Sequence, residues 1–235
     1  GEAVERYCGL RSPDAATVLS SRAALSGDSL DPERLALHSD AQCDALGFAR
    51  YTPQVELQWV RGSYPHTGAS VWIPSQAVSL APPTEGAVLF QATSNGMAAG
   101  TSYRETAAKA LLEVIERDAF LAAWYHRLHP RRVDWRTHPD PQVVGMGEAY
   151  ARRGVAIECY LLPTDHGIPV VAGLAIEEPV RTLAVLLGLG ADLSLSHAVR
   201  SAMLEVGQVR PALRIKLRDP AQIDRRAELV ADPSR

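Results

Sequence analysis

Apolar and polar positions along this chain follow two patterns, one typical of strands and the other of helices. Short apolar runs bounded by turn residues predict strands, and the segment 65–68 (Pro-His-Thr-Gly) predicts a turn between the first two. Longer segments with apolar residues three or four apart predict helices. The predicted strands cover 55–64, 69–73, 155–162, 168–176 and 182–188. The predicted helices cover 2–10, 102–127, 143–153 and 196–209, and another is expected to start within 29–34, with Pro32 in its first turn.

The order of these elements favours an α+β fold with mixed sheets and packed helices. The early strands are spaced as a hairpin, whereas strands and helices alternate later in the chain. No repeat of solenoid period and no low-complexity linker divides the sequence, so we expect a single domain over 1–235. The chain begins abruptly inside a predicted helix and ends in a polar segment without a clear stop signal. We therefore expect a partial domain, truncated at both ends.

Composition narrows the class of protein. A content of 46% apolar and 22% charged residues is that of an ordinary globular protein, and a net charge of −3 argues against a nucleic-acid partner. No apolar run reaches the roughly 20 residues that span a bilayer, so we expect no membrane association. The three cysteines are far apart and form no C-x-x-C, which favours a reducing, cytoplasmic setting. Cys8 is expected to be a small buried apolar residue.

The predicted helix 102–127 carries a cluster of charges. On a helical wheel, Glu105, Glu113 and Glu116 share one face, Arg117 lies beside it, and an apolar stripe borders it. The stripe that we expect to face the core contains Ala108, Leu111, Leu112, Ile115, Ala119 and Ala122. One interpretation is a solvated face with ion pairs four residues apart, Glu105 with Lys109 and Glu113 with Arg117. The other is a site where Mg²⁺ offsets the repulsion between the carboxylates.

A repeated pattern favours the second interpretation. Glu-x-x-Glu-Arg occurs at residues 2–6 and again at 113–117, and a similar element, Glu205-x-x-Gln208, lies in the last predicted helix. Three helices that present acidic or amide side chains three residues apart predict one convergent acidic pocket.

The same residues lie in stretches that resemble the YcaO family. The stretches are GEAVERYC at 1–8, SNGMAAGTSYRETAAKALLEVIERDAFLAAW at 94–124, GIPVVAGLA at 167–175 and GLGADLSLSHAVRSAMLEVGQVR at 188–210. The resemblance implies a YcaO-type ATP-binding fold without a P-loop, and the chain indeed lacks G-x-x-x-x-G-K-[ST]. It also implies ATP and Mg²⁺ as cofactors. The implied metal ligands are Glu2, Glu5, Glu113, Glu116 and Glu205. The implied nucleotide- and phosphate-binding residues are Thr101, Glu105, Arg117, Arg6 and Gln208; no catalytic residue is assigned.

Within the family, the chain most resembles the cyclodehydratases that form thiazole and oxazole rings in ribosomally made peptides. The resemblance implies a precursor peptide as substrate, an E1-like or leader-binding partner protein, and a homodimer as a further option. Three departures are visible: the segment before Gly1 and the C-terminal tail of the family are absent, and Ser201 stands where many relatives have Arg. Two alternatives stay open. They are thioamide or amidine formation by the same fold, and a non-catalytic protein that binds a peptide or partner.

Other candidates have simpler interpretations. His126 and His129 are spaced for a metal pair but have no evident third ligand, so we expect an exposed helix end. The segment 188–190 (Gly-Leu-Gly) is interpreted as a turn after a strand, and Trp124 and Tyr125 as core residues. Residues 94–96 (Ser-Asn-Gly) fit a phosphate-binding loop and a tight turn equally well.

Overall fold

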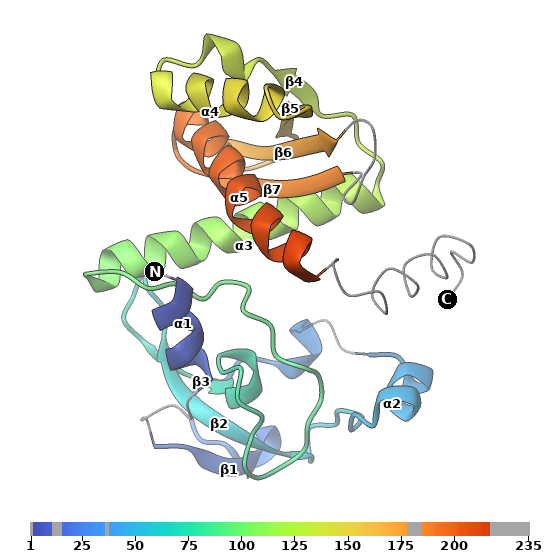
Figure 1. Cartoon of the computed structure of the whole chain (residues 1–235). Helices are drawn as coiled ribbons and strands as arrows, with labels where there is room; N and C mark the ends of the chain where they lie inside the picture. The colour runs from blue at the N-terminus through green and yellow to red at the C-terminus, as the bar shows by residue number, and fades with distance from the viewer. Residues whose placement is uncertain (1, 11–15, 36–37, 178–184, 217–235) are drawn as a thin grey trace. The chain divides into compact units, whose positions relative to one another are not determined.

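The computed structural model describes residues 2–10, 16–35, 38–177 and 185–216, apart from the side chains at 2, 3, 177 and 210–216 (Figure 1). The chain forms two compact units, Gly1–Ala110 and Leu111–Arg235. The α+β class is confirmed, and both sheets of the described residues are antiparallel throughout. Within those residues, no helix is both long and apolar enough to cross a membrane.

The N-terminal unit is built on a three-stranded sheet. Its strands are β1 (Val18–Ser21), β2 (Glu56–Ser63) and β3 (Ser70–Pro74), in the order β1-β2-β3. Leu57, Trp59 and Leu89 form the centre of its core, and the Trp59 indole donates to the carbonyl of Ser20 at 2.9 Å. The hairpin 55–73 was predicted. Strand β1 was missed because four residues are too few to show the pattern of apolar positions that is typical of a strand. The remaining elements are α1 (Glu2–Gly9) and the 3₁₀ turns η1 (Arg22–Ala24), η2 (Pro32–Arg34) and η3 (Ser75–Ala77).

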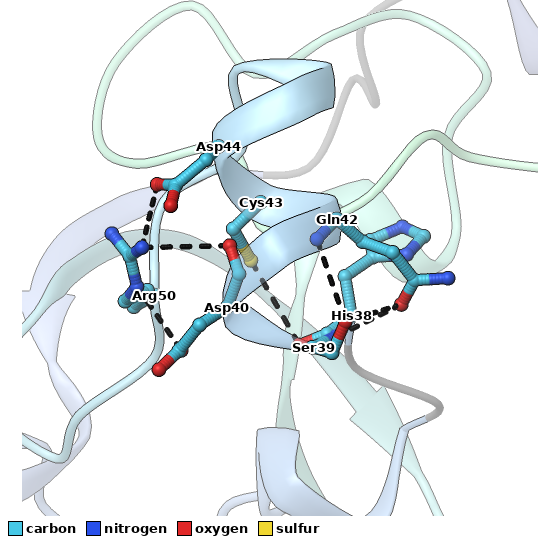
Figure 2. A network of polar contacts seen from close by, with 7 residues as sticks. All are labelled: His38, Ser39, Asp40, Gln42, Cys43, Asp44 and Arg50. Carbon is cyan, nitrogen blue, oxygen red and sulfur yellow. Dashed lines mark hydrogen bonds and ion pairs between the residues drawn. The ribbon is translucent and has the colours of Figure 1, made fainter.

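A short helix, α2 (Asp40–Leu46), shows how local polar contacts define an element that has little apolar pattern (Figure 2). Ser39 and Gln42 form a capping box at its start, and Gly47 ends it in the left-handed conformation. Arg50 pairs with Asp40 at 3.0 Å and with Asp44 at 2.5 Å. The helix start predicted within 29–34 is a single 3₁₀ turn, in which the Asp31 side chain accepts from the Glu33 amide.

The C-terminal unit is a four-stranded sheet with helices on both faces. The strands β4 (Arg131–Val133), β5 (Val155–Leu162), β6 (Val170–Glu177) and β7 (Val185–Ala191) are adjacent in chain order. One face is covered by α4 (Pro141–Ala151) and α5 (Leu195–Lys216), with the 3₁₀ turn η4 (Trp135–Thr137) beside them. The strand predicted at 155–162 coincides with β5. Residues 182–184 of the last predicted strand lie outside the described residues.

The long helix α3 (Tyr103–Tyr125) contributes its second half to the other face of this sheet. The residues that pack there are Ile115, Ala119 and Ala123, one helical turn apart. The predicted apolar stripe was therefore right at its centre and wrong at its start, because Leu111 is exposed. Trp124 and Tyr125, expected in the core, are 69% and 75% exposed, although the neighbouring Ala123 packs on the sheet.

The glycines of 188–190 lie inside β7, so their interpretation as a turn was wrong. Only glycine fits at positions 188 and 190, because α5 crosses the strand at very short range. A Cβ atom on Gly188 would lie 2.5 Å from the carbonyl oxygen of Ala202, and one on Gly190 would collide with the carbonyl of Ala198. Glycine at both positions lets the backbone of α5 approach β7 closely enough for α5 side chains to reach the strand's edge.

Candidate functional site

Two acidic side chains accept hydrogen bonds from the backbone of β7, the last strand of the C-terminal sheet. Within the described residues β7 is an edge strand, with β6 as its single neighbour. The amide of Leu189 donates to Oε2 of Glu205 on α5 at 2.5 Å. The carboxylate of Glu116 on α3 accepts a hydrogen bond from the backbone of Ala191. Helices on opposite faces of the sheet thus bring two carboxylates to the same edge.

A guanidinium links these carboxylates to a third. Nη2 of Arg117 lies 3.5 Å from Glu116, 3.7 Å from Glu113 and 3.7 Å from Glu205. The ion pair expected between Glu113 and Arg117 is therefore present. One positive charge faces three carboxylates, and the buried Nε of Arg117 has no hydrogen-bond partner among the described residues. We refer to Glu113, Glu116, Arg117 and Glu205 as the acidic cluster.

The environment of Glu116 is unfavourable for a negative charge. Its side chain is only 12% exposed, and burial raises the pKa of its carboxyl from 4.5 to about 7. This pKa of about 7 already includes smaller upward contributions from the carboxylates of Glu205 and Glu113 and downward contributions from Arg117 and the Ala191 backbone. A buried carboxyl with nearby like charges is the environment in which an added cation gives the largest electrostatic gain.

The donor chemistry of the acidic cluster suits magnesium. Mg²⁺ prefers oxygen ligands and is commonly held by one or two carboxylates together with phosphate oxygens and water. Within the described residues, no three His, Cys, Asp or Glu side chains are already spaced around a common metal position. In the acidic cluster the Arg117 guanidinium lies within 3.7 Å of each carboxylate. A metal ion bound there would thus share these carboxylates with Arg117.

The acidic residue at the start of α3, Glu105, has local hydrogen-bond donors and a lysine that stabilise its charge. Glu105 accepts from the amide of Thr101 at 3.1 Å and from its hydroxyl at 2.6 Å, and Lys109 approaches it at 2.6 Å. The hydrogen bond from Lys109 and those from Thr101 lower the pKa of this exposed carboxyl to about 2. The ion pair predicted between Glu105 and Lys109 is present, so the solvated-face interpretation describes this first turn well.

A cavity of about 450 Å³ in the N-terminal unit includes Glu5. Its wall is formed by α1, by the loop 97–100 and by Thr106 near the start of α3. Residues 94–96 form a tight turn, in which the Met97 amide donates to Ser94 O at 3.0 Å and Gly96 has a positive φ of 78°. Cys8 lines the same cavity and is exposed, which contradicts the expectation of a buried residue. It is exposed because it faces this open cavity and not a packed layer.

The structure thus brings together four of the predicted site residues: Glu113, Glu116, Arg117 and Glu205. Gln208 lies three residues beyond Glu205 on α5 and is exposed. Thr101 and Glu105 pair with each other in the N-terminal unit, where Glu5 and the exposed Arg6 also lie. Glu2 is part of α1, and its side chain is outside the described residues. Convergence of all three acidic helices on one pocket stays a prediction.

Two features of these sites were missed from the sequence. The amides of Leu189 and Ala191 act as donors at the edge of β7, and the loop 97–100 lines the cavity near Glu5. The glycines on either side of Leu189 were the available signal, because glycine inside a strand often marks a close approach of another backbone. His126 and His129 are exposed, as expected, and are not part of a three-ligand cluster in the described residues.

Comparison with known families identifies the family of this chain. A family model described as "YcaO cyclodehydratase, ATP- and Mg²⁺-binding" matches residues 1–234. The chain belongs to the YcaO family. Its resemblance to this family, noted in the sequence, is confirmed.

Individual proteins and solved structures are also similar to this chain. An uncharacterised protein of Methanothermobacter thermautotrophicus is 31% identical over 212 residues, which cover 89% of this chain and 52% of that protein. A heterocyclase solved in complex with substrate and cofactor is 26% identical with a TM-score of 0.80, over 88% of this chain and 30% of that chain. YcaO from Methanopyrus kandleri, bound with AMPPCP and Mg²⁺, is 25% identical with a TM-score of 0.70, over 92% of this chain and 52% of that chain. The chain spans about half the length of this curated relative and 37% of the length of another, an uncharacterised protein of Rhizobium leguminosarum bv. trifolii that is 29% identical over 161 residues.

Proposed function

We propose that this YcaO chain binds ATP and Mg²⁺ and activates backbone amides of a peptide by phosphorylation. The single observation that carries the proposal is the acidic cluster, where three carboxylates from α3 and α5 surround one guanidinium at the edge of β7. A fold without a P-loop has to hold phosphates through other groups, and carboxylates do so only by way of a metal ion. The ATP- and Mg²⁺-binding description of the family agrees with this chemistry.

Each residue of the acidic cluster has a distinct part in this proposal. Glu113, Glu116 and Glu205 are the proposed ligands of magnesium in the C-terminal unit. Arg117 neutralises them while no metal is bound, and it is then available to contact a phosphate oxygen. The hydrogen bond from the Leu189 amide fixes the carboxylate of Glu205, so that its second oxygen can face the metal.

The remaining predicted site residues keep, within this proposal, the roles that the resemblance to the family implies. Glu2 and Glu5 would supply further metal ligands from α1. Thr101 and Glu105 would border the phosphates at the start of α3, and Arg6 and Gln208 would contact the nucleotide. The cavity beside Glu5 supports this proposal, because its volume of about 450 Å³ leaves room for part of a nucleotide.

The most specific form of the proposal is cyclodehydration in a ribosomally made precursor peptide. A Cys, Ser or Thr side chain attacks the preceding amide carbonyl, the resulting oxygen takes the γ-phosphoryl group of ATP, and phosphate leaves as an azoline forms. Magnesium supplies charge neutralisation on the phosphates. The acidic cluster positions the reacting groups, which is the main protein contribution to phosphoryl transfer. The precursor peptide, an E1-like or leader-binding partner, a homodimer and a cytoplasmic setting all belong to the proposal.

The first experiment tests nucleotide binding. The affinity of the chain for a non-hydrolysable ATP analogue is measured by calorimetry with Mg²⁺ and with EDTA. We expect binding with Mg²⁺ only, and we expect Glu113→Gln and Glu205→Gln to weaken it about tenfold or more. Glu148→Gln on α4 is the matched control, because that glutamate is exposed and pairs with Arg152 at 3.9 Å. Binding that is equal in EDTA would contradict the magnesium assignment.

The second experiment tests the chemistry. The chain is incubated with ATP, Mg²⁺ and the precursor peptide encoded beside it, with and without the neighbouring partner protein, and the peptide mass is recorded. Loss of one water per modified residue supports cyclodehydration. Replacement of oxygen by sulfur would assign thioamide formation instead, and binding of the peptide without any mass change or ATP turnover would indicate a non-catalytic binding protein.

A further inference from the structure

The second half of α3 borders a cavity to which the proposed function gives no role. Its volume is about 330 Å³, and it lies between α3 and the residues 163–166 that follow β5. Every residue of its wall belongs to the C-terminal unit, and none is part of the acidic cluster. A concave site that combines an apolar wall with a few polar side chains is a typical place for a ligand.

The polar part of the wall offers negative charge and hydrogen-bond acceptors. It consists of Asp118, Thr164, Asp165 and His166. The carboxylates of Asp118 and Asp165 come from different segments, and neither has an ion pair or hydrogen bond with any residue that the structure describes. The Thr164 hydroxyl donates to the Ile168 carbonyl at 3.2 Å, so this hydroxyl can offer an incoming group only its lone pairs. The cavity therefore favours a ligand that donates hydrogen bonds and carries positive charge.

The arginines next to this wall in sequence do not neutralise the two aspartates. Arg117 precedes Asp118, but its guanidinium lies within 3.7 Å of all three glutamates of the acidic cluster. Arg127 precedes Leu128; it is exposed and pairs with neither aspartate in the described part of the chain. The negative charge of the cavity thus has no partner among the described residues, and a bound cation would supply one.

The rest of the wall is apolar, and it restricts the kind of cation that fits. It consists of Ala119, Ala122, Leu128 and Pro163. A small hydrated ion would gain nothing from this surface, whereas a cation on an aliphatic chain can bury its methylene groups there and keep its charged head near the carboxylates. A metal ion is a poor occupant for a second reason: among the described residues, no three His, Cys, Asp or Glu side chains could hold one together. The two properties of the wall together select an aliphatic cation.

We infer that this cavity binds the side chain of a lysine or arginine residue in a peptide. The methylene groups of that side chain pack against Ala122 and Leu128, and its ammonium or guanidinium group faces Asp118 and Asp165. Asp165 and His166 are exposed, so the cavity opens to solvent beside them and the peptide backbone can stay outside. Binding here does not require the proposed ATP site. It can therefore be absent while Mg²⁺-dependent nucleotide binding is present, and the reverse is also true.

The experiment follows the methyl NMR signals of Ala119, Ala122 and Leu128 at low salt while four probes are titrated into the chain. The first probe is the peptide Gly-Ser-Lys-Ser-Gly with capped ends, and the second is the same peptide with norleucine, which keeps the stem without the charge. The third is methylammonium, which has the charge without the stem, and the fourth is capped lysine. We expect the lysine peptide to shift these signals with an affinity about tenfold higher than that of norleucine or methylammonium. Equal affinity for any two of these three would overturn the inference, and so would binding of capped lysine without binding of the peptide.

Two variants test the role of the carboxylates. Asp118→Asn and Asp165→Asn each remove one charge and keep the shape of the side chain, so each should weaken binding of the lysine peptide about three- to fivefold. Glu148→Gln is the matched control, because it removes the same charge from an exposed residue of α4 outside the cavity, and it should leave the affinity unchanged. The methyl signals of the remaining core report whether each variant is folded. Unchanged affinity in both folded aspartate variants, or an equal loss in Glu148→Gln, would overturn the inference.

Discussion

Both ends of the charged face of α3 carry glutamates, but the two environments shift the pKa of the carboxyl in opposite directions. At the start of the helix, Glu105 is exposed and is held by Thr101 and Lys109, which lower the pKa of its carboxyl to about 2. Three turns later, Glu116 is 12% exposed and lies near two other carboxylates, and the pKa of its carboxyl is raised to about 7. The first carboxylate has local donors that satisfy it, whereas the second lacks enough positive charge.

This difference shows why two glutamates on the same face of one helix can have different roles. The wheel position of a glutamate is the same in both cases, so the deciding factor is what lies opposite. Opposite Glu105 there is solvent and the chain that enters the helix. Opposite Glu116 there are the edge of β7 and Glu205 of α5. The predictions below test whether the surplus negative charge of the acidic cluster serves to bind a metal.

The largest effect is expected for Glu116→Gln. The amide keeps the shape of the side chain but removes a proposed metal ligand, so ATP turnover should fall by about 100-fold or more and Mg²⁺-dependent nucleotide binding should weaken in parallel. The far-UV circular dichroism spectrum should stay unchanged. Turnover is measured as released phosphate, with Glu148→Gln as control. Wild-type turnover in a folded Glu116→Gln protein would contradict the magnesium assignment.

The second prediction concerns the pH dependence of stability without metal. The pKa of the Glu116 carboxyl is about 7 in the folded chain and 4.5 in the unfolded reference, so the folded state binds this proton more tightly. Its stabilising contribution is complete below pH 4.5 and is lost as the pH rises through 7. The unfolding free energy of the metal-free chain should thus fall by about 2–3 kcal/mol between pH 5 and pH 8.

Urea denaturation in EDTA at the two pH values provides the measurement. Glu116→Gln should remove most of the decrease, because its side chain does not titrate. A stability that rises over the same interval, or a decrease of equal size in the variant, would show that Glu116 does not have a raised pKa.

The third prediction concerns Arg117→Ala. Without metal, the variant lacks the guanidinium that contacts Glu113, Glu116 and Glu205, and it should lose about 1 kcal/mol of stability, a small value because Arg117 is partly exposed to solvent. Added Mg²⁺ should stabilise this variant more than the wild type, since the ion no longer shares the carboxylates with an arginine. Thermal unfolding with EDTA and with Mg²⁺ gives both values. A smaller Mg²⁺ effect in the variant would instead assign Arg117 a direct part in holding the metal site together.

The smallest effect is expected for Glu105, at the start of α3. Glu105→Gln weakens the contacts with Thr101 and Lys109 at the exposed start of α3, and the midpoint of thermal unfolding should fall by about 2–4 °C. Affinity for the ATP analogue, measured on the same sample, then tests whether Glu105 also borders the phosphates. Loss of nucleotide binding comparable to that of Glu116→Gln would place both ends of the helix in the site.

Much of the fold could be predicted from the sequence because the long elements carry strong periodic patterns. The limits of α3 and β5 were predicted to within two residues, since each is bounded by turn residues and has many apolar positions. The elements that were missed, β1, α2 and β4, have at most seven residues. Elements of this length are defined by partners distant in sequence or by single caps such as Ser39, which a periodic pattern does not reveal.

The site was predicted in part for a similar reason. The spacing of Glu113, Glu116 and Arg117 is a property of one helix and can be read directly. The approach of Glu205 depends on how α5 crosses β7, which Gly188 and Gly190 allow through close packing between distant segments. Trp124 and Cys8 are exposed because of how the surrounding segments pack, which cannot be read from residue type alone.

The position of β7 at the edge of its sheet, among the described residues, has a further consequence. An edge strand whose amides point outward can pair with a strand of another molecule, which is a common route to aggregation. Here Glu205 and Glu116 accept from the amides of alternate residues along that edge, so a second strand would have to displace two carboxylates to bind. The side chains proposed to hold magnesium would thus also hinder the edge of β7 from pairing with a strand of another molecule. Substitutions that remove both carboxylates should therefore endanger solubility as well as activity.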